Sequence, residues 1–402
     1  MREPWVIFPV TPPLPPAHDP RLIQSALMAS NELISHPSEL RPDTAWHQTR
    51  WAWTSEESLI DHRGKPRLCA AALLPFRERR PDWEGFYASL RWMQSAADHY
   101  GVEWVPVLNA DTGYLFDMSD ALYAEVLERF RSEFPGHRFI AGVTARGAMP
   151  SAPFTPDTYR RLLDLVQPHG NCEVMLMTSQ WLNALEPEAR RDAYFTMADW
   201  LVCPGIVHAL EPSFVPWATP FDPWLLYQLA SHPKFVAGKI STLDEPHFLY
   251  WAAMCRDLQL DFVPHSGDDF GLATAIKLGL PLLIGAAVSA APLICAAKDL
   301  WLEDGAPGKK FPTGRGGFDT RVYKLFEALQ SLEDQVFRLD ARLSASPYKH
   351  STAHVLHALG ILHSPEPHPD CADLRGPDEA DQMEAALRRP KRMAQKLGIP
   401  GF

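Results

Sequence analysis

The sequence lacks the features of an exported, membrane-spanning or nucleic-acid-binding protein. Its six cysteines are scattered, with no Cys-x-x-Cys pair and no zinc-like spacing, so we expect reduced, buried thiols of the kind found in the cytoplasm. No run approaches the ~18 uninterrupted apolar residues of a membrane helix, and the N-terminus has no apolar segment typical of a signal peptide. A formal charge of −11 disfavours a nucleic-acid or anionic-membrane partner, because such partners attract a basic face. Any acidic substrate would therefore need a local cationic or amide-rich site.

A Gly-rich dinucleotide fingerprint is also missing after the first predicted strand, which disfavours a Rossmann fold, and no cofactor is expected. Instead, short apolar runs alternate with amphipathic helix patterns from residue 67 onward. This alternation indicates a parallel sheet with both faces covered by helices. The predicted strands are 68–75, 102–108, 138–143, 174–177, 201–210, 235–240, 262–263 and 281–288. Eight such units favour a closed (β/α)8 barrel, the TIM barrel fold, over an open doubly wound sheet.

The chain is longer than one such barrel, and its composition changes twice along the sequence. Residues 1–66 contain a cluster of prolines, and we expect an irregular N-terminal extension there. Residues 67–304 hold the strand–helix units of the barrel. Residues 305–402 begin with a Gly- and Lys-rich stretch and then show helical periodicity, so we expect an appended C-terminal helical segment packed on the barrel. The helices predicted in it are 320–345, 347–361 and 378–397.

Polar residues follow most of the predicted strands. In a (β/α)8 barrel the catalytic groups lie at the carboxyl ends of the strands, where the loops converge. The residues at these positions are therefore the candidates for the site. They are Asp111, Thr112, Gly113, Arg146, Gln180, His208, Glu211, Lys239, His265, Ser266, Asp268 and Asp269.

Lys239 is the most informative of these candidates. It ends the apolar strand 235–240, and a lysine drawn into a barrel loses solvation, which lowers its pKa toward neutrality. A neutral amine can attack a ketone and form an imine, which then serves as an electron sink for making or breaking a bond. The alternative is a lysine that ends its strand and reaches solvent.

Seven stretches carry a resemblance to a known family. They are Leu74-Pro75-Phe76, Asp111-Thr112-Gly113, Phe139-Ile140-Ala141-Gly142-Val143, Val236-Ala237-Gly238-Lys239, His265-Ser266-Gly267-Asp268-Asp269, Ala291-Pro292, and Ser346-Pro347-Tyr348-Lys349 with Leu359-Gly360-Ile361. In this order and at this spacing they resemble the dihydrodipicolinate synthase/N-acetylneuraminate lyase family, over residues 67–397. The resemblance implies a class I aldolase-type barrel that acts on a 2-oxo acid and assembles as a dimer or tetramer.

The resemblance also implies roles for individual residues. Lys239 matches the lysine that forms the Schiff base. Thr112 matches the threonine that holds the substrate carboxylate, and Gly113 keeps that turn open. Asp111 replaces the first threonine of the family's pair, where it could repel a carboxylate or take over proton transfer. A plain turn before the next helix is the alternative for Asp111 and Thr112.

Two departures argue against dihydrodipicolinate synthase proper. The family's Y-N-x-P stretch becomes His208-Ala209-Leu210-Glu211-Pro212, without its tyrosine and without a following arginine, and P-Y-Y becomes Thr178-Ser179-Gln180-Trp181. His208 or Glu211 could replace the tyrosine as the proton-transfer group, or could be a core histidine and a capping glutamate. Arg146 could clamp a carboxylate, or could be a surface arginine.

Three functions follow from these observations. The first is a Schiff-base-forming lyase, acting on a carbon–carbon or carbon–oxygen bond of a 2-oxo acid or sugar-derived substrate. Lys239 would be its nucleophile, and Gln180, His265, Ser266 and Asp268 would contact the substrate. The second is a metal-dependent isomerase or lyase, with a divalent ion on the set His208, Glu211, His265, Asp268 and Asp269. The third is a barrel that binds a ligand without catalysis, which the missing tyrosines and the missing arginine motivate.

Overall fold

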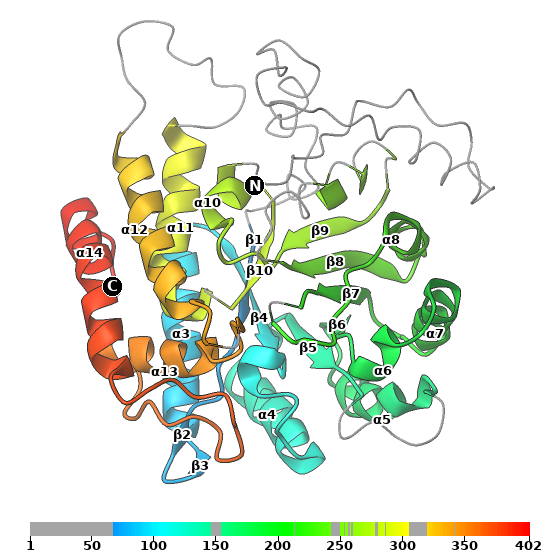
Figure 1. The fold of residues 1–402 in the computed structure, drawn as a ribbon. Helices are drawn as coiled ribbons and strands as arrows, with labels where there is room; N and C mark the ends of the chain where they lie inside the picture. Colours follow the sequence, from blue (N-terminus) through cyan, green and yellow to red (C-terminus); the bar gives the residue numbers. More distant parts are fainter. Residues whose placement is uncertain are drawn as a thin grey trace, which may run out of the picture.

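Eight parallel strands close into a barrel in the computed structural model (Figure 1). The structure describes residues 67–402, apart from 146–153, 213, 243–249, 253, 256, 257, 259, 278, 279, 286, 305–319 and 342. Around the barrel the strand order is β1-β10-β9-β8-β7-β6-β5-β4. The strands are β1 (Arg67–Ala71), β4 (Glu103–Leu108), β5 (Phe139–Val143), β6 (Cys172–Leu176), β7 (Gly205–Leu210), β8 (Phe235–Ser241), β9 (Val263–Ser266) and β10 (Leu282–Ile284). A two-stranded ribbon of β2 (Phe76–Arg77) and β3 (Arg80–Pro81) follows β1.

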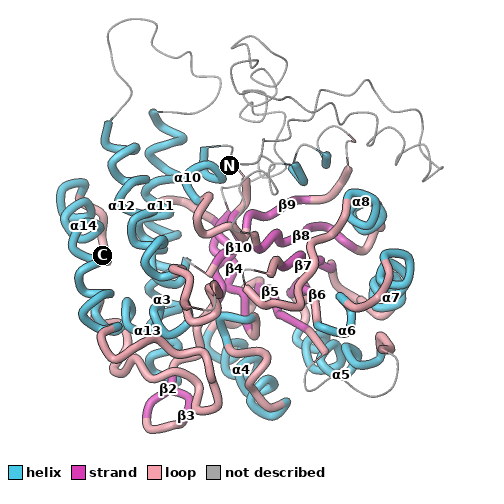
Figure 2. The backbone as a smooth tube through the Cα atoms, viewed as in Figure 1, coloured by secondary structure: helices cyan, strands magenta, loops and turns pink. Residues whose placement is uncertain are grey.

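Helices alternate with these strands and cover the outside of the barrel (Figure 2). Side-chain caps begin several of them: the side chains of Asp82, Ser119 and Asp222 each accept a hydrogen bond from the backbone N–H of the residue three positions later. Such a cap contributes about 1 kcal/mol to a helix. The helices are α3 (Trp83–His99), η3 (Asp111–Gly113), α4 (Asp120–Glu133), α5 (Asp157–Val166), η4 (Gln167–His169), α6 (Gln180–Asn183), α7 (Pro187–Asp199), α8 (Pro223–Ala230), α10 (Leu272–Lys277) and α11 (Ala287–Asp304).

The C-terminal helices pack together on one side of the barrel, next to α11 and α3 (Figure 1). They are α12 (Thr320–Val336), α13 (Tyr348–Ala358) and α14 (Glu379–Leu397). An ion pair between Arg338 and the buried carboxylate of Glu379 ties α14 to the end of α12. The segment is thus an additional helical layer, and its middle helix, α13, touches both α12 and α14.

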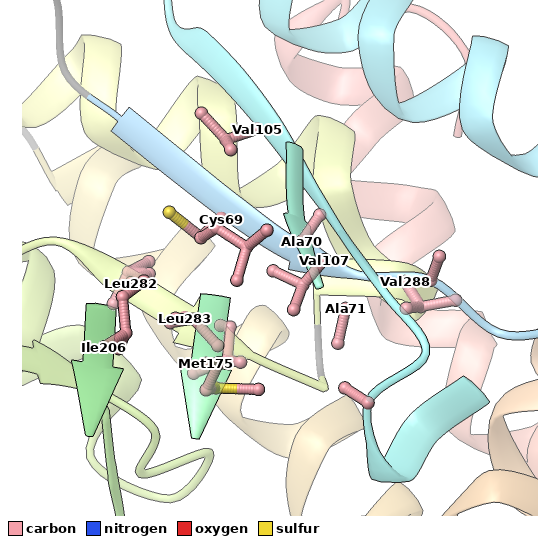
Figure 3. Packing of buried hydrophobic residues seen from close by; sticks show 14 of the residues in the cluster. Cys69, Ala70, Ala71, Val105, Val107, Met175, Ile206, Leu282, Leu283 and Val288 are labelled. Carbon is pink, nitrogen blue, oxygen red and sulfur yellow. The ribbon is translucent and has the colours of Figure 1, made fainter. Parts of the chain in front are cut away.

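Small and medium-sized apolar side chains fill the barrel. Figure 3 shows Cys69, Val107, Met175 and Ile206, from four different strands, gathered in one cluster. Each of these side chains is fully buried or nearly so. Close packing of this kind fixes the strand positions, and therefore the positions of the polar groups at the strand ends.

The (β/α)8 barrel and the C-terminal helices predicted from the sequence are confirmed. Two of the strands are shorter than predicted, because the residues that flank them lack strand geometry. The predicted strand 201–210 is β7, which begins at Gly205, after Pro204, and the predicted strand 281–288 is β10, which ends at Ile284. His265 and Ser266 lie inside β9, although the sequence placed them in the turn that follows it. The proposed extension 1–66 lies outside the described residues, as does much of the boundary at 305. Among the described helices none is long and apolar enough to cross a membrane.

Candidate active site

Three polar side chains, which we call the polar row, lie next to each other on β7, β8 and β9. Lys239 is paired with His208 on one side and with His265 on the other. Gly238, the residue before the lysine, faces outward: a Cβ there would lie 2.9 Å from Cζ3 of Trp251, in the helical stretch after β8. Because side chains alternate along a strand, all three members of the polar row point into the barrel.

The amine of Lys239 is held almost dry. The residue is 9% exposed, and its Cε lies 3.0 Å from the place that a Cβ on Gly267 would take. Burial lowers the pKa of Lys239 from its ordinary value, while the carboxylates of Asp269 and Asp111 act in the opposite direction. A lowered pKa increases the share of neutral amine at pH 7, and the neutral amine is the form that attacks a carbonyl carbon.

The two histidines of the polar row are buried and uncharged at pH 7. His208 Nε2 lies 2.9 Å from Ser241 Oγ, and burial, together with the charge of Lys239, lowers the pKa of His208 well below its ordinary value. His265 Nδ1 lies 3.1 Å from the carbonyl oxygen of Val263, and burial lowers its pKa to about 3. The row therefore carries no second positive charge beside the lysine.

Asp111, Thr112 and Gly113 form the short helix η3 directly after β4. Thr112 is buried, and a Cβ on Gly113 would lie 3.2 Å from the carbonyl oxygen of Ala72, which leaves little room for a side chain. The turn thus holds a carboxylate and a hydroxyl at the carboxyl end of a barrel strand. This is the place at which substrates of (β/α)8 barrels bind.

Tyr348 and Lys349, from the start of α13, reach this turn from the C-terminal segment. Tyr348 Oη lies 2.8 Å from Thr112 Oγ1 and donates to Asp111 Oδ2 at 3.0 Å. Lys349 Nζ lies 2.9 Å from Asp111 Oδ1. The hydroxyl chain, as we call Thr112, Tyr348 and Asp111, thus joins the barrel to the appended helices.

These contacts decide the charges of the hydroxyl chain. Burial alone would raise the pKa of Asp111, but the ammonium of Lys349 and the hydroxyl of Tyr348 outweigh it, so the pKa is lowered and the carboxylate stays ionised. Burial would lower the pKa of Lys349, and Asp111 raises it above its ordinary value. Burial and the charge of Asp111 raise the pKa of Tyr348 well above its ordinary value. At pH 7 the site contains an ion pair and a neutral phenol.

The turn after β9 supplies further acidic groups. Ser266 Oγ accepts a hydrogen bond from the Asp268 N–H at 3.3 Å, and Asp268 Oδ1 accepts one from the Phe270 N–H at 2.9 Å. These contacts shape the turn. The carboxylate of Asp269, also buried, acts electrostatically on Lys239.

A buried carboxyl group from α12 adjoins this turn. Glu333 is fully buried, and neither of its carboxyl oxygens has a hydrogen-bond partner in the part of the chain that the structure describes. Burial, and then the charges of Asp269 and Asp334, raise the pKa of Glu333 well above its ordinary value. Glu333 is therefore a neutral carboxylic acid under conditions in which most glutamates are ionised.

Two of the remaining predicted residues, Glu211 and Gln180, lie beyond the ends of their strands. Glu211 follows β7, is half-buried, and its N–H donates to the Ser241 carbonyl at 3.2 Å. Gln180 begins α6, and its side chain is exposed. Arg146 lies outside the described residues.

The described residues place no group of three or more His, Cys, Asp and Glu side chains in a position to hold a metal ion. Within the set named for the metal-dependent alternative, His208 is instead in contact with Ser241, and His265 with a backbone carbonyl. The carboxylate of Asp268 accepts a hydrogen bond from the Phe270 N–H within the turn after β9. The arrangement of these side chains gives that alternative no support.

Tyr348 and Lys349 were not among the residues that the sequence proposed for the site. They belong to the stretch Ser346-Pro347-Tyr348-Lys349, which contributed to the family resemblance but carried no role. The contact between Thr112 and Tyr348 joins positions 236 residues apart, so no local pattern indicates it. One feature of the sequence could have pointed to these two residues: the stretch contains a tyrosine, and the fifth predicted strand lacks the tyrosine that the family has there.

No protein-family profile and no curated protein matches the chain by sequence. Solved structures do match it by fold. A monomeric variant of dihydrodipicolinate synthase superimposes with a TM-score of 0.64 at 14% identity, over 82% of this chain and 97% of the other. The chain has the fold of dihydrodipicolinate synthase.

Two other structures support the same conclusion. The dihydrodipicolinate synthase of Acinetobacter baumannii, chloride-inhibited and complexed with pyruvate, matches with a TM-score of 0.62 at 16% identity, over 81% of this chain and 99% of the other. KD(P)GA from T. tenax matches with a TM-score of 0.60 at 16% identity, over 81% of this chain and 99% of the other. At such identities the likeness establishes the fold, and the function has to be argued from the site.

Proposed function

We propose that this protein is a Schiff-base-forming lyase of the class I aldolase type, acting on a 2-oxo acid or a sugar-derived keto acid. The observation that carries the proposal is the inward-facing, nearly dry amine of Lys239, between two uncharged histidines. Desolvation favours the neutral amine, and the neutral amine is the nucleophile in imine formation. The imine then withdraws electrons from the bond that is made or broken.

Each neighbouring group has a part in the proposed reaction. Thr112, buried at the end of β4, would hold the substrate carboxylate through its hydroxyl. His208, neutral and beside Lys239, would accept or donate a hydrogen bond at the reacting centre. Glu211 stands at the end of the same strand and would exchange protons with solvent. The neutral carboxyl of Glu333 limits the negative charge that a substrate anion would meet.

The structures of similar fold favour a pyruvate-like substrate. One of them is complexed with pyruvate, and another is KD(P)GA. The departures at the fifth strand, where His208 stands, exclude a straightforward transfer of the dihydrodipicolinate synthase reaction. We therefore propose the substrate class, a 2-oxo acid, and a dimer or tetramer as the assembly.

Borohydride trapping tests this function. The wild-type protein is incubated with pyruvate or 2-keto-3-deoxygluconate, reduced with borohydride, and weighed by intact mass spectrometry. We expect one reduced keto-acid adduct per chain in the wild type and none in Lys239→Met. Lys324→Met removes an exposed lysine of α12 and serves as the matched control, which should be labelled like the wild type. Absence of an adduct from the wild type with both acids would overturn the proposal.

A further inference from the structure

The ring and the hydroxyl of Tyr348 make different contacts. The ring stacks on Phe337 at a centroid distance of 4.6 Å, and both are buried. The hydroxyl instead reaches out of the helical layer to two residues that follow β4, namely Thr112 and Asp111. A buried hydroxyl in contact with two polar groups, one of them charged, can pass a proton between them.

We propose that Tyr348 is the proton-relay residue of the imine chemistry, passing protons between Asp111 and Thr112 in place of the tyrosine missing from β7. The proposal rests on the Schiff-base function proposed above. It assigns a role in that reaction to a helix outside the barrel.

The barrel is shaped to admit this side chain. Gly285 follows β10, and a Cβ there would lie 3.0 Å from Tyr348 Cε2, 3.0 Å from Phe337 Cζ and 3.6 Å from Thr112 Oγ1. Any larger residue would press on both rings. A glycine at the end of β10 thus leaves the gap through which the phenol enters the barrel.

The polarity of the hydroxyl chain suits a relay. Asp111 is held ionised by Lys349, so its carboxylate accepts a hydrogen bond from the Tyr348 hydroxyl in the resting enzyme. In the resting enzyme the Thr112 hydroxyl therefore donates to the phenol oxygen; once Asp111 holds a proton and donates to Tyr348, the phenol can donate to Thr112, whose own proton is then available to the substrate. Asp111 and Lys239 are close enough for their charges to interact, and Asp111 follows β4 at the carboxyl end of the barrel, where β8 also ends.

The proton balance of imine formation requires such a path. An ammonium and a ketone give an iminium and one water, and both hydrogens of that water come from the ammonium. One proton first moves from Lys239 to Asp111. Nζ then bonds to the carbonyl carbon as the C=O π pair moves onto oxygen. That oxygen takes up one proton from Nζ and the one held by Asp111, passed along by Tyr348 and Thr112. The C–O bond breaks with its electron pair leaving on water, and the nitrogen lone pair forms the C=N bond.

The substitution Tyr348→Phe tests the proposal, because it keeps the stacked ring and removes only the hydroxyl. With pyruvate and borohydride, we expect adduct formation on Lys239 to slow by about 100-fold, with the half-saturating pyruvate concentration within about twofold of wild type. Tyr123→Phe is the matched control. Its buried hydroxyl donates to the Gly142 carbonyl at 2.8 Å, away from the hydroxyl chain, and its loss should change the rate less than about twofold.

A double variant separates a relay from a structural effect. Members of one relay act as a unit, so Tyr348→Phe with Thr112→Val, measured at saturating pyruvate, should be no slower than the slower single variant. Two independent structural effects would multiply instead. Thr112→Val alone also interrupts the chain, so the proposal stays testable if Tyr348→Phe fails to fold.

The failures of the two proposals look different. If the wild type forms an adduct and folded Tyr348→Phe forms it at the same rate, the relay is wrong and the Schiff-base function stands. If the rate falls but the double variant multiplies the single effects, the relay is also wrong. If the wild type forms no adduct, both proposals fall.

Discussion

The ammonium of Lys349 lies 2.9 Å from Oδ1 of Asp111 and joins a helix of the C-terminal segment to the end of a barrel strand. The lysine side chain is 6% exposed and the aspartate side chain 32%, so the pair is only partly screened by water. The contact connects the appended helices to the candidate active site. Tyr348, the preceding residue, donates a hydrogen bond to the same aspartate.

Removal of that lysine should cost stability. Lys349→Met leaves the carboxylate of Asp111 without its ammonium, and we expect a loss of about 1–3 kcal/mol in the free energy of unfolding. Urea unfolding at neutral pH measures it. Arg389→Met is the matched control: it breaks the exposed pair of Arg389 with Glu327 and should cost less than about 1 kcal/mol. Equal losses in the two variants would show that the Lys349–Asp111 pair stabilises the fold no more than an exposed ion pair does.

The buried histidine of β9 should make the protein sensitive to acid. The pKa of His265 is about 3 in the folded chain and about 6.5 when unfolded, so the unfolded chain binds the proton first. This contribution to stability is present above about pH 6.5 and is lost progressively as the pH falls toward 3. When the pH falls from about 7.5 to about 5, the free energy of unfolding should decrease by about 2 kcal/mol less in His265→Asn than in the wild type.

Thermal or urea unfolding at the two pH values checks this. His363→Asn, which removes an exposed histidine, should lose as much stability as the wild type over the same range. A His265→Asn variant that followed the wild-type curve would contradict the burial of an uncharged ring in β9.

The neutral carboxyl of Glu333 should act in the opposite pH range. Its pKa is raised by folding, so the folded chain pays to ionise it, and stability falls as the pH rises above the unfolded value near 4.5. Glu333→Gln cannot ionise. We expect its melting temperature to exceed that of the wild type by about 2 °C or more near pH 8, and the difference to shrink near pH 4.5. A constant difference at both pH values would mean that ionisation of Glu333 is not involved.

The space at Gly285 should be strictly limited. Gly285→Ala places a methyl group 3.0 Å from both Tyr348 and Phe337, and overpacking of this kind costs typically about 1–3 kcal/mol. We expect a lower melting temperature together with slower adduct formation on Lys239, because the phenol is displaced from Thr112. Slower adduct formation without any loss of stability would argue for a different cause.

Periodicity and the resemblance together predicted the barrel and the polar residues at its strand ends. Lys239 could be predicted because it lies near the carboxyl end of an apolar run; the alternation of side chains along β8, which continues to Ser241, then turns it inward. The position of His265 within β9 could not, because the strand 263–266 is short and contains Pro264. Tyr348 and Lys349 could not be predicted either, since their contacts with η3 depend on how a separate helical layer docks on the barrel.

A crystal structure of the wild-type protein reduced with borohydride in the presence of pyruvate tests the central claim most directly. We expect continuous density from Lys239 Nζ to the former carbonyl carbon, inside the barrel, with the carboxylate against Thr112. An unmodified lysine whose amine turns away from the barrel into bulk water would contradict it.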